Sequence, residues 1–168
     1  MRKTSITCLH FLLLFCTGCD RDKRSITGDY SYKISGEVEL TDADGGVSYR
    51  LIHRNGQMHI LKDKSQKSRY ILTLNEMNGG CYTVPATLHG DSLILEMHTF
   101  NTNILSSNGL PDFDQEDNPS LVYRVTASGG GVINGDMLML TERWDGHQSG
   151  NPHATLKGME MNIIAEKN

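Results

Sequence analysis

Apolar and polar residues alternate with a period of two along most of the chain, which is typical of half-buried β-strands. The alternation begins at Tyr30 and continues to Leu40, and no later segment shows a convincing 3.6-residue period. About eight to nine antiparallel strands in one chain predict an all-β fold, an up-and-down β-barrel, with a β-sandwich as the alternative. Other alternating segments lie at 47–53, 58–60, 70–74, 82–88, 93–97, 121–127, 131–133, 138–140 and 159–165.

Three dipeptides predict tight turns between these strands. Asn55-Gly56 favours a type I′ hairpin, which would oppose Leu51 to Ile60 and His53 to Met58. In that register His53 and His59 point to opposite faces, so they cannot share one metal ion.

The similar stretches "LHGDSLIL" (88–95) and "INGDMLML" (133–140) each contain Gly-Asp. Glycine in the first position suits a type II′ turn, which opposes Leu88 to Leu93 and Ile133 to Leu138.

The first 18 residues have the features of an export signal. A cationic start, Met1-Arg2-Lys3, precedes an apolar run from Ile6 to Cys16 and then small residues. The run is shorter than the roughly 20 residues that a spanning helix needs. We therefore expect a signal-peptide helix in residues 1–18, a polar tether in 19–27 and one domain in 28–168.

Cys16-Thr17-Gly18-Cys19 is a C-x-x-C sequence, but neither a redox dithiol nor a zinc knuckle is supported around it. A dithiol needs a βαβ context, and a zinc site needs further ligands, whereas Cys81 is the one later cysteine. We expect Cys81 to be a small buried residue. The four residues resemble a bacterial lipobox, which implies lipid attachment at Cys19 and anchoring to a bacterial membrane, in the periplasm or at the cell surface. Plain secretion is the alternative.

Charge argues against one class of partner. Sixteen basic and 20 acidic residues give a net charge of −4, which lacks the basic footprint of a nucleic-acid-binding protein.

Gly28-Asp29-Tyr30 at the start of the first strand resembles the Gly-x-Trp that opens the first strand of lipocalin-like (calycin) proteins, with Tyr30 in the position of the tryptophan. The repeated Gly-Asp hairpins are similar to those of small bacterial lipocalin-like lipoproteins. Classical members pack a basic residue on the tryptophan, for which Lys157 and Arg143 are candidates here. The resemblance implies a barrel with a ligand-binding interior.

Alternation along the strands predicts which side chains face that interior. They either fill the barrel or line a cavity for one small apolar ligand, and both interpretations remain open. The inward set is Tyr32, Tyr49, Leu51, Met58, Tyr82, Met97, Tyr123, Met159 and Met161.

Two polar segments are candidate sites. Residues 101–119 form the longest unpatterned stretch, which is a solvated loop or a lid whose apolar contacts would be Leu110 and Phe113. Asp145, His147 and His153 are expected in a loop between the last two strands. The first segment has Asp117 where an EF-hand calcium loop needs glycine. The second is expected to be a polar Gly/Pro loop, with metal ligation or a position at the barrel mouth as the alternatives, and we predict no metal site.

No nucleophile elbow, phosphate loop or zinc helix occurs in the sequence, so we predict no catalytic residues, no cofactor and no enzyme. The leading hypothesis is a membrane-anchored protein of the cell envelope that binds a small hydrophobic or amphiphilic ligand. The alternatives are a non-enzymatic accessory module of a surface assembly, whose protein partner is unknown, and a hydrolase or isomerase with a site at the barrel mouth.

Overall fold

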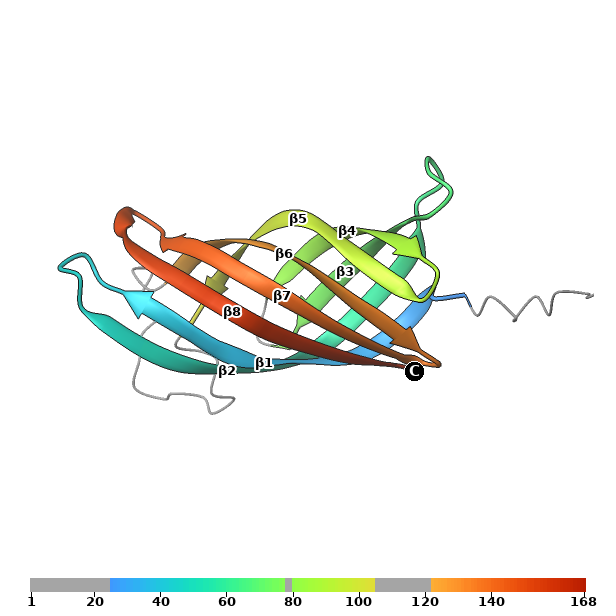
Figure 1. Cartoon of the computed structure of the whole chain (residues 1–168), viewed down its shortest axis with the longest axis horizontal. Coiled ribbons are helices and arrows are strands. Elements are labelled where there is room, and N and C mark those ends of the chain that lie inside the picture. The colour runs from blue at the N-terminus through green and yellow to red at the C-terminus, as the bar shows by residue number, and fades with distance from the viewer. Residues whose placement is uncertain (1–24, 78–79, 105–121) are drawn as a thin grey trace, which may run out of the picture.

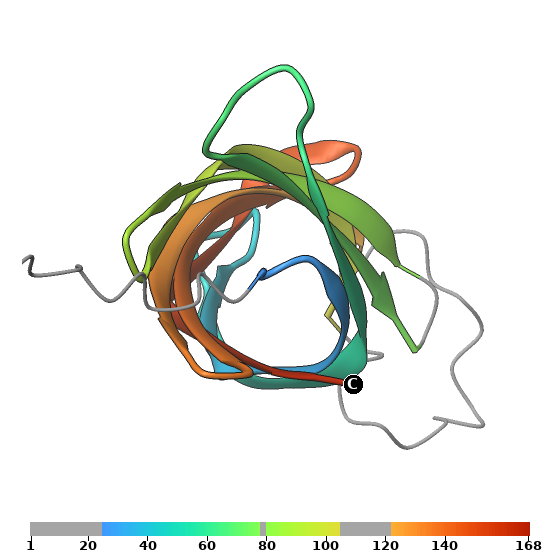
Figure 2. The same ribbon diagram turned by 90° about the vertical axis from the view of Figure 1, so that its right-hand side faces the viewer.

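The computed structural model describes residues 25–77, 80–104 and 122–168, which form a closed antiparallel β-barrel (Figures 1 and 2). Each strand pairs with the next one along the chain, and the last strand closes the barrel against the first. The eight strands are β1 (Gly28–Thr41), β2 (Val47–Lys62), β3 (Arg69–Glu76), β4 (Cys81–His89), β5 (Ser92–Asn103), β6 (Val122–Asn134), β7 (Met137–Gln148) and β8 (Asn151–Lys167).

The predicted all-β barrel is confirmed. The sheet closes on itself, so the β-sandwich alternative does not apply. Eight strands are present, because β2 and β6 are each one continuous strand where two shorter strands were predicted. None of the described residues forms a helix long and apolar enough to cross a bilayer.

Both ends of the described chain lie at one end of the barrel, which we call the entry end (Figure 1). There the Lys167 Nζ donates a hydrogen bond to the Ser25 carbonyl oxygen. The Asn168 backbone N–H donates a hydrogen bond to the Asp29 carbonyl oxygen. The β1–β2 and β7–β8 turns lie at the opposite end, the far end (Figure 1).

The Gly-Asp turns at the entry end match the prediction in type and register. Leu88 pairs with Leu93, and Ile133 pairs with Leu138. Gly90 and Gly135 have φ angles of 61° and 65°, while the aspartate after each has a negative φ, as a type II′ turn requires.

The hairpin predicted at Asn55-Gly56 is wrong, because β2 runs through it without a turn. Gly56 faces the interior, where a Cβ atom would overlap the Asn75 carbonyl and lie 2.9 Å from the Tyr32 ring. The glycine therefore allows close approach of strands, not a turn. In a continuous strand residues 51 and 58 face opposite sides, so Tyr49 and Leu51 point outward while Met58 is buried.

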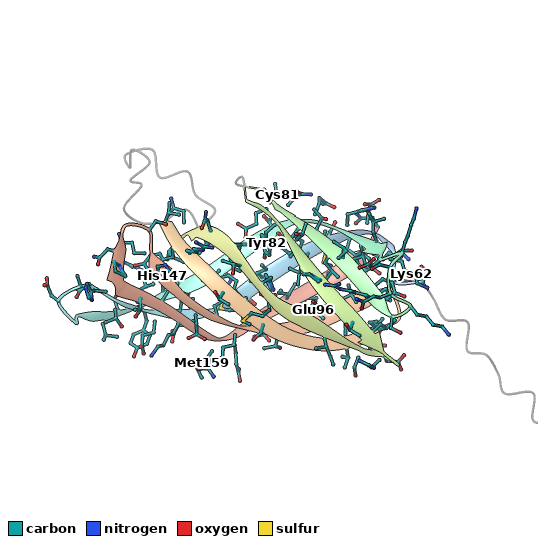
Figure 3. All side chains as sticks on the ribbon, turned by 90° about the horizontal axis from the view of Figure 1, so that it is seen from above. Lys62, Cys81, Tyr82, Glu96, His147 and Met159 are labelled. Carbon is teal, nitrogen blue, oxygen red and sulfur yellow. The ribbon has the colours of Figure 1, made fainter. Side chains whose placement is uncertain are left out.

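Two β-bulges explain why Met97 and Met159 do not face the interior as predicted. The register of β5 shifts between Leu95 and His98, and that of β8 shifts between Gly158 and Met161. Each extra residue reverses the alternation beyond it, so Met97 and Met159 project outside the barrel, as Figure 3 shows for Met159. The four outward members of the predicted set, Tyr49, Leu51, Met97 and Met159, are 58–74% exposed.

The other five members of that set lie in the core. Whether they line a cavity stays a prediction. They are Tyr32, Met58, Tyr82, Tyr123 and Met161.

The predicted tether, residues 19–27, contains one residue of the core near its end. Ile26 is buried, and its carbonyl accepts a hydrogen bond of 2.9 Å from the Tyr30 hydroxyl. The Lys167 Nζ lies 6.0 Å from the centre of the Tyr30 ring, within the range of a cation–π contact. The basic residue on this ring is thus Lys167, and not Lys157 or Arg143.

Three successive glycines let β6 approach both of its neighbours. A Cβ atom at Gly129 would overlap the Thr141 carbonyl oxygen of β7, and one at Gly130 would lie 2.6 Å from the Leu93 carbonyl oxygen of β5. At Gly131 it would overlap the Met139 carbonyl oxygen. These contacts are with backbone, which cannot move aside without separating the strands.

We predict that Gly131→Ala lowers the free energy of unfolding by at least about 2 kcal/mol, because the added methyl overpacks the β6–β7 interface. Urea unfolding followed by the fluorescence of Trp144 measures the change. Ser128→Ala, at an exposed position of the same strand, should change the stability by less than about 0.5 kcal/mol. Equal effects of the two substitutions would contradict this account.

Candidate binding site in the barrel interior

A group of polar and aromatic side chains lies inside the otherwise apolar barrel. The β5 bulge turns His98, Phe100 and Thr102 inward, where regular alternation would have placed Met97 and Thr99. We call this group the inner cluster, and it consists of Tyr32, Tyr82, His98, Phe100, Thr102, Glu142 and Trp144.

Aromatic rings hold the cluster together. The Tyr82 and Phe100 rings are stacked with centroids 4.5 Å apart, and Phe100 meets Trp144 edge to face at 5.2 Å. The His98 imidazole lies nearly parallel to Tyr82, at 6.0 Å. These distances are those of favourable aromatic pairs, so the rings orient the polar atoms at their edges.

The Glu142 carboxylate lies between two partners. Its Oε2 accepts a hydrogen bond of 2.9 Å from the Trp144 Nε1, and its Oε1 lies 3.4 Å from the His98 Nε2. The second contact has an ion-pair distance, but its geometry does not make it a hydrogen bond. Both side chains of this pair are almost completely buried, with exposed fractions of 3% and 1%.

The contacts of His98 indicate which ring nitrogen carries a hydrogen. The His98 Nδ1 lies 3.0 Å from the Glu96 carbonyl oxygen, which only accepts, so the Nδ1 carries a hydrogen. In the neutral ring the Nε2 is then an acceptor, and an ionised Glu142 would place two acceptors against each other in a buried site. A proton on the Glu142 carboxyl removes that repulsion, and burial favours this uncharged form.

Burial also shifts the ionisation of the cluster. It raises the pKa of Glu142, although the hydrogen bond from Trp144 and the nearby His98 partly oppose the effect. It raises the pKa of the Tyr82 and Tyr32 hydroxyls, with nearby carboxylates adding to the shift. Both tyrosines are therefore neutral donors and acceptors of hydrogen bonds at physiological pH.

A largely but not fully buried ion pair lies beside the cluster, toward the far end. The Arg54 Nη1 donates to both carboxylate oxygens of Glu76, at 3.0 and 3.1 Å, and its Nη2 donates to the Asn103 carbonyl at 3.0 Å. The β2–β3 pairing ends at Gly56 with Glu76, so the Arg54 side chain links β2 to β5 beyond the last β2–β3 pair. The positive charge of Arg54 is thus matched within the barrel.

Four buried atoms of the inner cluster have no hydrogen-bond partner in the described part of the chain. An unsatisfied buried polar group costs about 1–3 kcal/mol, so four in one cluster are a concentrated destabilising feature. Such a set marks a place where a bound polar group or water would be stabilising. The atoms are the hydroxyl oxygens of Tyr32, Tyr82 and Thr102 and the Nε2 of His98.

Sequence reasoning placed Tyr32 and Tyr82 correctly in the interior but missed the remaining polar members. For two of these a signal was present, because Glu142 and Trp144 continue the alternation of Leu138 and Leu140. His98 could not be found from alternation, since the bulge reverses it. Cys19 and the proposed lid residues Leu110 and Phe113 lie outside the described residues.

The histidines and acids expected in the last loop are not brought together in a loop. Asp145 and His147 belong to β7, and His153 belongs to β8, all with outward or exposed side chains. Within residues 25–77, 80–104 and 122–168, no group of three or more histidine, cysteine, aspartate or glutamate side chains could hold a metal ion.

His53 and His59 lie on the same face of β2, not on opposite faces as the predicted hairpin required. Both point outward from the continuous β2, and six residues of strand hold them about 20 Å apart. The His59 Nδ1 instead contacts the Asp29 carboxylate at 2.5 Å. Cys81 was expected to be buried but is exposed, because its neighbour Tyr82 takes the inward position.

The chain matches no protein-family model, and no curated protein or solved structure is found to match it.

We predict that the stability of the barrel falls as the pH rises above about 4.5, the ordinary pKa of a glutamate. The pKa of Glu142 is raised in the folded state, so the folded chain binds more protons than the unfolded chain between the two pKa values. The contribution is complete below the unfolded pKa and is lost as the pH passes the folded pKa, by at most about 1.4 kcal/mol per pH unit.

Urea unfolding of the wild type and of Glu142→Gln over a range of pH tests this prediction. The amide still accepts from Trp144 but does not titrate, so the variant should lose this component of the pH dependence. Glu160→Gln, at an exposed position, should behave as the wild type does. Parallel curves for the wild type and Glu142→Gln would refute the assignment.

Proposed function

We propose that this protein is a lipid-anchored protein of the bacterial cell envelope whose lipocalin-like barrel binds a small amphiphilic molecule in its interior. The observation that carries the binding proposal is the inner cluster, with four unpartnered polar atoms in an apolar surrounding. An apolar site with a few convergent polar groups is the usual composition of a small-molecule site.

The charges around the cluster favour an uncharged polar group on the ligand. Arg54 is neutralised by Glu76, and burial favours the uncharged form of Glu142. A charged head group would add an unmatched charge to a buried site, which is strongly unfavourable. The unpartnered hydroxyls both donate and accept, and this suits an alcohol or a protonated carboxylic acid.

The apolar part of the ligand would contact the side chains between the cluster and the entry end. Met58 and Met161 lie in this interior, and both are fully buried. Unbranched methionine side chains repack more readily than branched ones, so they suit a binding interior that must adapt to a guest.

Decanol and decanoate test the proposal, because they share one chain and differ in the charge of the polar end. Decanol should change the fluorescence of Trp144, the one tryptophan of the chain, and bind more tightly than decanoate at neutral pH. Decanoic acid should gain affinity as the pH falls toward the pKa of its carboxyl group. If neither compound bound at any pH, interior binding of an amphiphile would be refuted.

Two nearly isosteric substitutions should weaken the binding of decanol. Tyr82→Phe and Thr102→Val each remove one hydroxyl, which costs a hydrogen bond of about 1 kcal/mol and about a fivefold loss of affinity. Tyr49→Phe removes a hydroxyl from the outer surface and should leave the affinity unchanged. Equal affinities of all three variants would argue against the inner cluster as the site.

Two features support the lipocalin-like part of the proposal. The strands follow one another around a closed barrel, and a basic residue of the last strand lies over the aromatic ring that opens the first. In the resemblance to lipocalin-like proteins, this ring is Tyr30, and the basic residue is Lys167.

The anchor is tested by metabolic labelling with a fatty acid. Cys19→Ala should abolish the labelling, because it removes the sulfur that would carry the lipid. Cys8→Ala is the matched control, since Cys8 belongs to the segment that would be removed but lies outside the lipobox, and labelling should persist. Labelling of the Cys19→Ala variant would show that the lipobox assignment is wrong.

A further inference from the structure

A group of apolar side chains projects from the outer surface of the barrel near the entry end. Each is 39–51% exposed, although neighbouring outward positions on the same strands are mostly polar. We call this group the outer patch, and it consists of Ile94 of β5, Val132 of β6, Met137 and Met139 of β7, and Ile164 of β8.

Strand register shows that the outer patch is contiguous. Met139 pairs with Val132 on one side and with Ile164 on the other, so three strands contribute directly opposed apolar side chains. Val132 pairs with Ser92, which makes Ile94 its diagonal neighbour. Directly opposed side chains on one face have Cβ atoms about 5 Å apart, so these residues form one surface.

The surroundings of the outer patch are mostly uncharged. The next row along the strands consists of Gly130, Thr141 and Asn162, and charged neighbours occur at the edge, where Lys33 pairs with Ile164 and Glu166 pairs with Met137. Contiguous exposed apolar surface bordered by polar residues marks an interaction surface.

The position of Ser25, where the described chain begins, indicates which partner the outer patch contacts. Met137 begins β7 directly after the Gly135-Asp136 turn, and Ile164 precedes Lys167, whose Nζ donates to the Ser25 carbonyl. Ser25 is the sixth residue after Cys19, and six fully extended residues span at most about 22 Å. A lipid on Cys19 would therefore hold the entry end of the barrel close to the bilayer.

We propose that the outer patch rests on the surface of the lipid bilayer and orients the barrel against the membrane. This proposal depends on the lipid anchor proposed at Cys19. A short tether restricts the barrel to the vicinity of the bilayer, where exposed apolar side chains gain by entering the interfacial region. Two of the five side chains are methionines, whose flexible chains conform to an irregular partner surface.

Site-specific fluorescence tests the proposal on the full acylated chain. The exposed Cys81 is first replaced by serine, and Met139→Cys or Tyr49→Cys then gives a single labelling position for an environment-sensitive dye. Tyr49 is the matched control, because it is also exposed and apolar but lies on β2 toward the far end. Each protein is reconstituted with phosphatidylethanolamine and phosphatidylglycerol vesicles that contain a nitroxide-labelled lipid.

We expect the dye at position 139 to be quenched by the nitroxide lipid several-fold more strongly than the dye at position 49. Flotation of the protein with the vesicles reports the anchor separately. Flotation with equal quenching at the two positions would overturn the orientation proposal and leave the anchor intact. Failure of the acylated preparation to float would overturn both.

Substitution within the outer patch gives a second measurement. Val132→Ser with Ile164→Thr removes apolar surface at exposed positions, where effects on folding are small. The dye at position 139 should then be quenched less, while the dye at position 49 should not change. Unchanged quenching at position 139 would count against contact between the outer patch and lipid.

Discussion

The structure depends on one constraint, which is that successive side chains of a strand in a closed barrel must alternate between inside and outside. One extra residue in β5 and one in β8 reverse this alternation part of the way along each strand. The first bulge turns His98 inward and Met97 outward, and the second does the same for Met161 and Met159. The composition of both surfaces of the barrel follows from these two positions.

The inward turn of β5 brings one ionisable group, His98, into an apolar core that also holds Glu142. Burial of Glu142 is tolerable because Trp144 donates to one of its oxygens and because burial favours the uncharged carboxyl. Arg54 and Glu76 neutralise each other's charge through their hydrogen-bonded ion pair. What remains unsatisfied is a set of neutral hydroxyls and one imidazole nitrogen, and this remainder is the chemical basis for proposing an uncharged polar group as the ligand's head.

Closure of the barrel also separates an inner surface from an outer one, and each carries its own candidate binding region. The interior holds the inner cluster, whereas the outer patch lies outside, on the wall formed by β5 to β8 at the entry end. Glycines of β6 connect the two, because Gly129 and Gly131 permit the close approach of β6 to β7 that sets Val132 opposite Met139. A change in this packing would affect both surfaces at once.

Local sequence alone determined the strand class, the two Gly-Asp turns and their register, because alternation and turn conformation act between residues close together in the chain. It failed at Asn55-Gly56, where glycine serves the approach of Asn75 and Tyr32, residues distant in sequence. It failed again at Met97 and Met159, since a bulge is defined only relative to the neighbouring strand. Tertiary structure therefore decided which polar side chains meet inside, because that depends on pairing between strands and not on the order of residues within one.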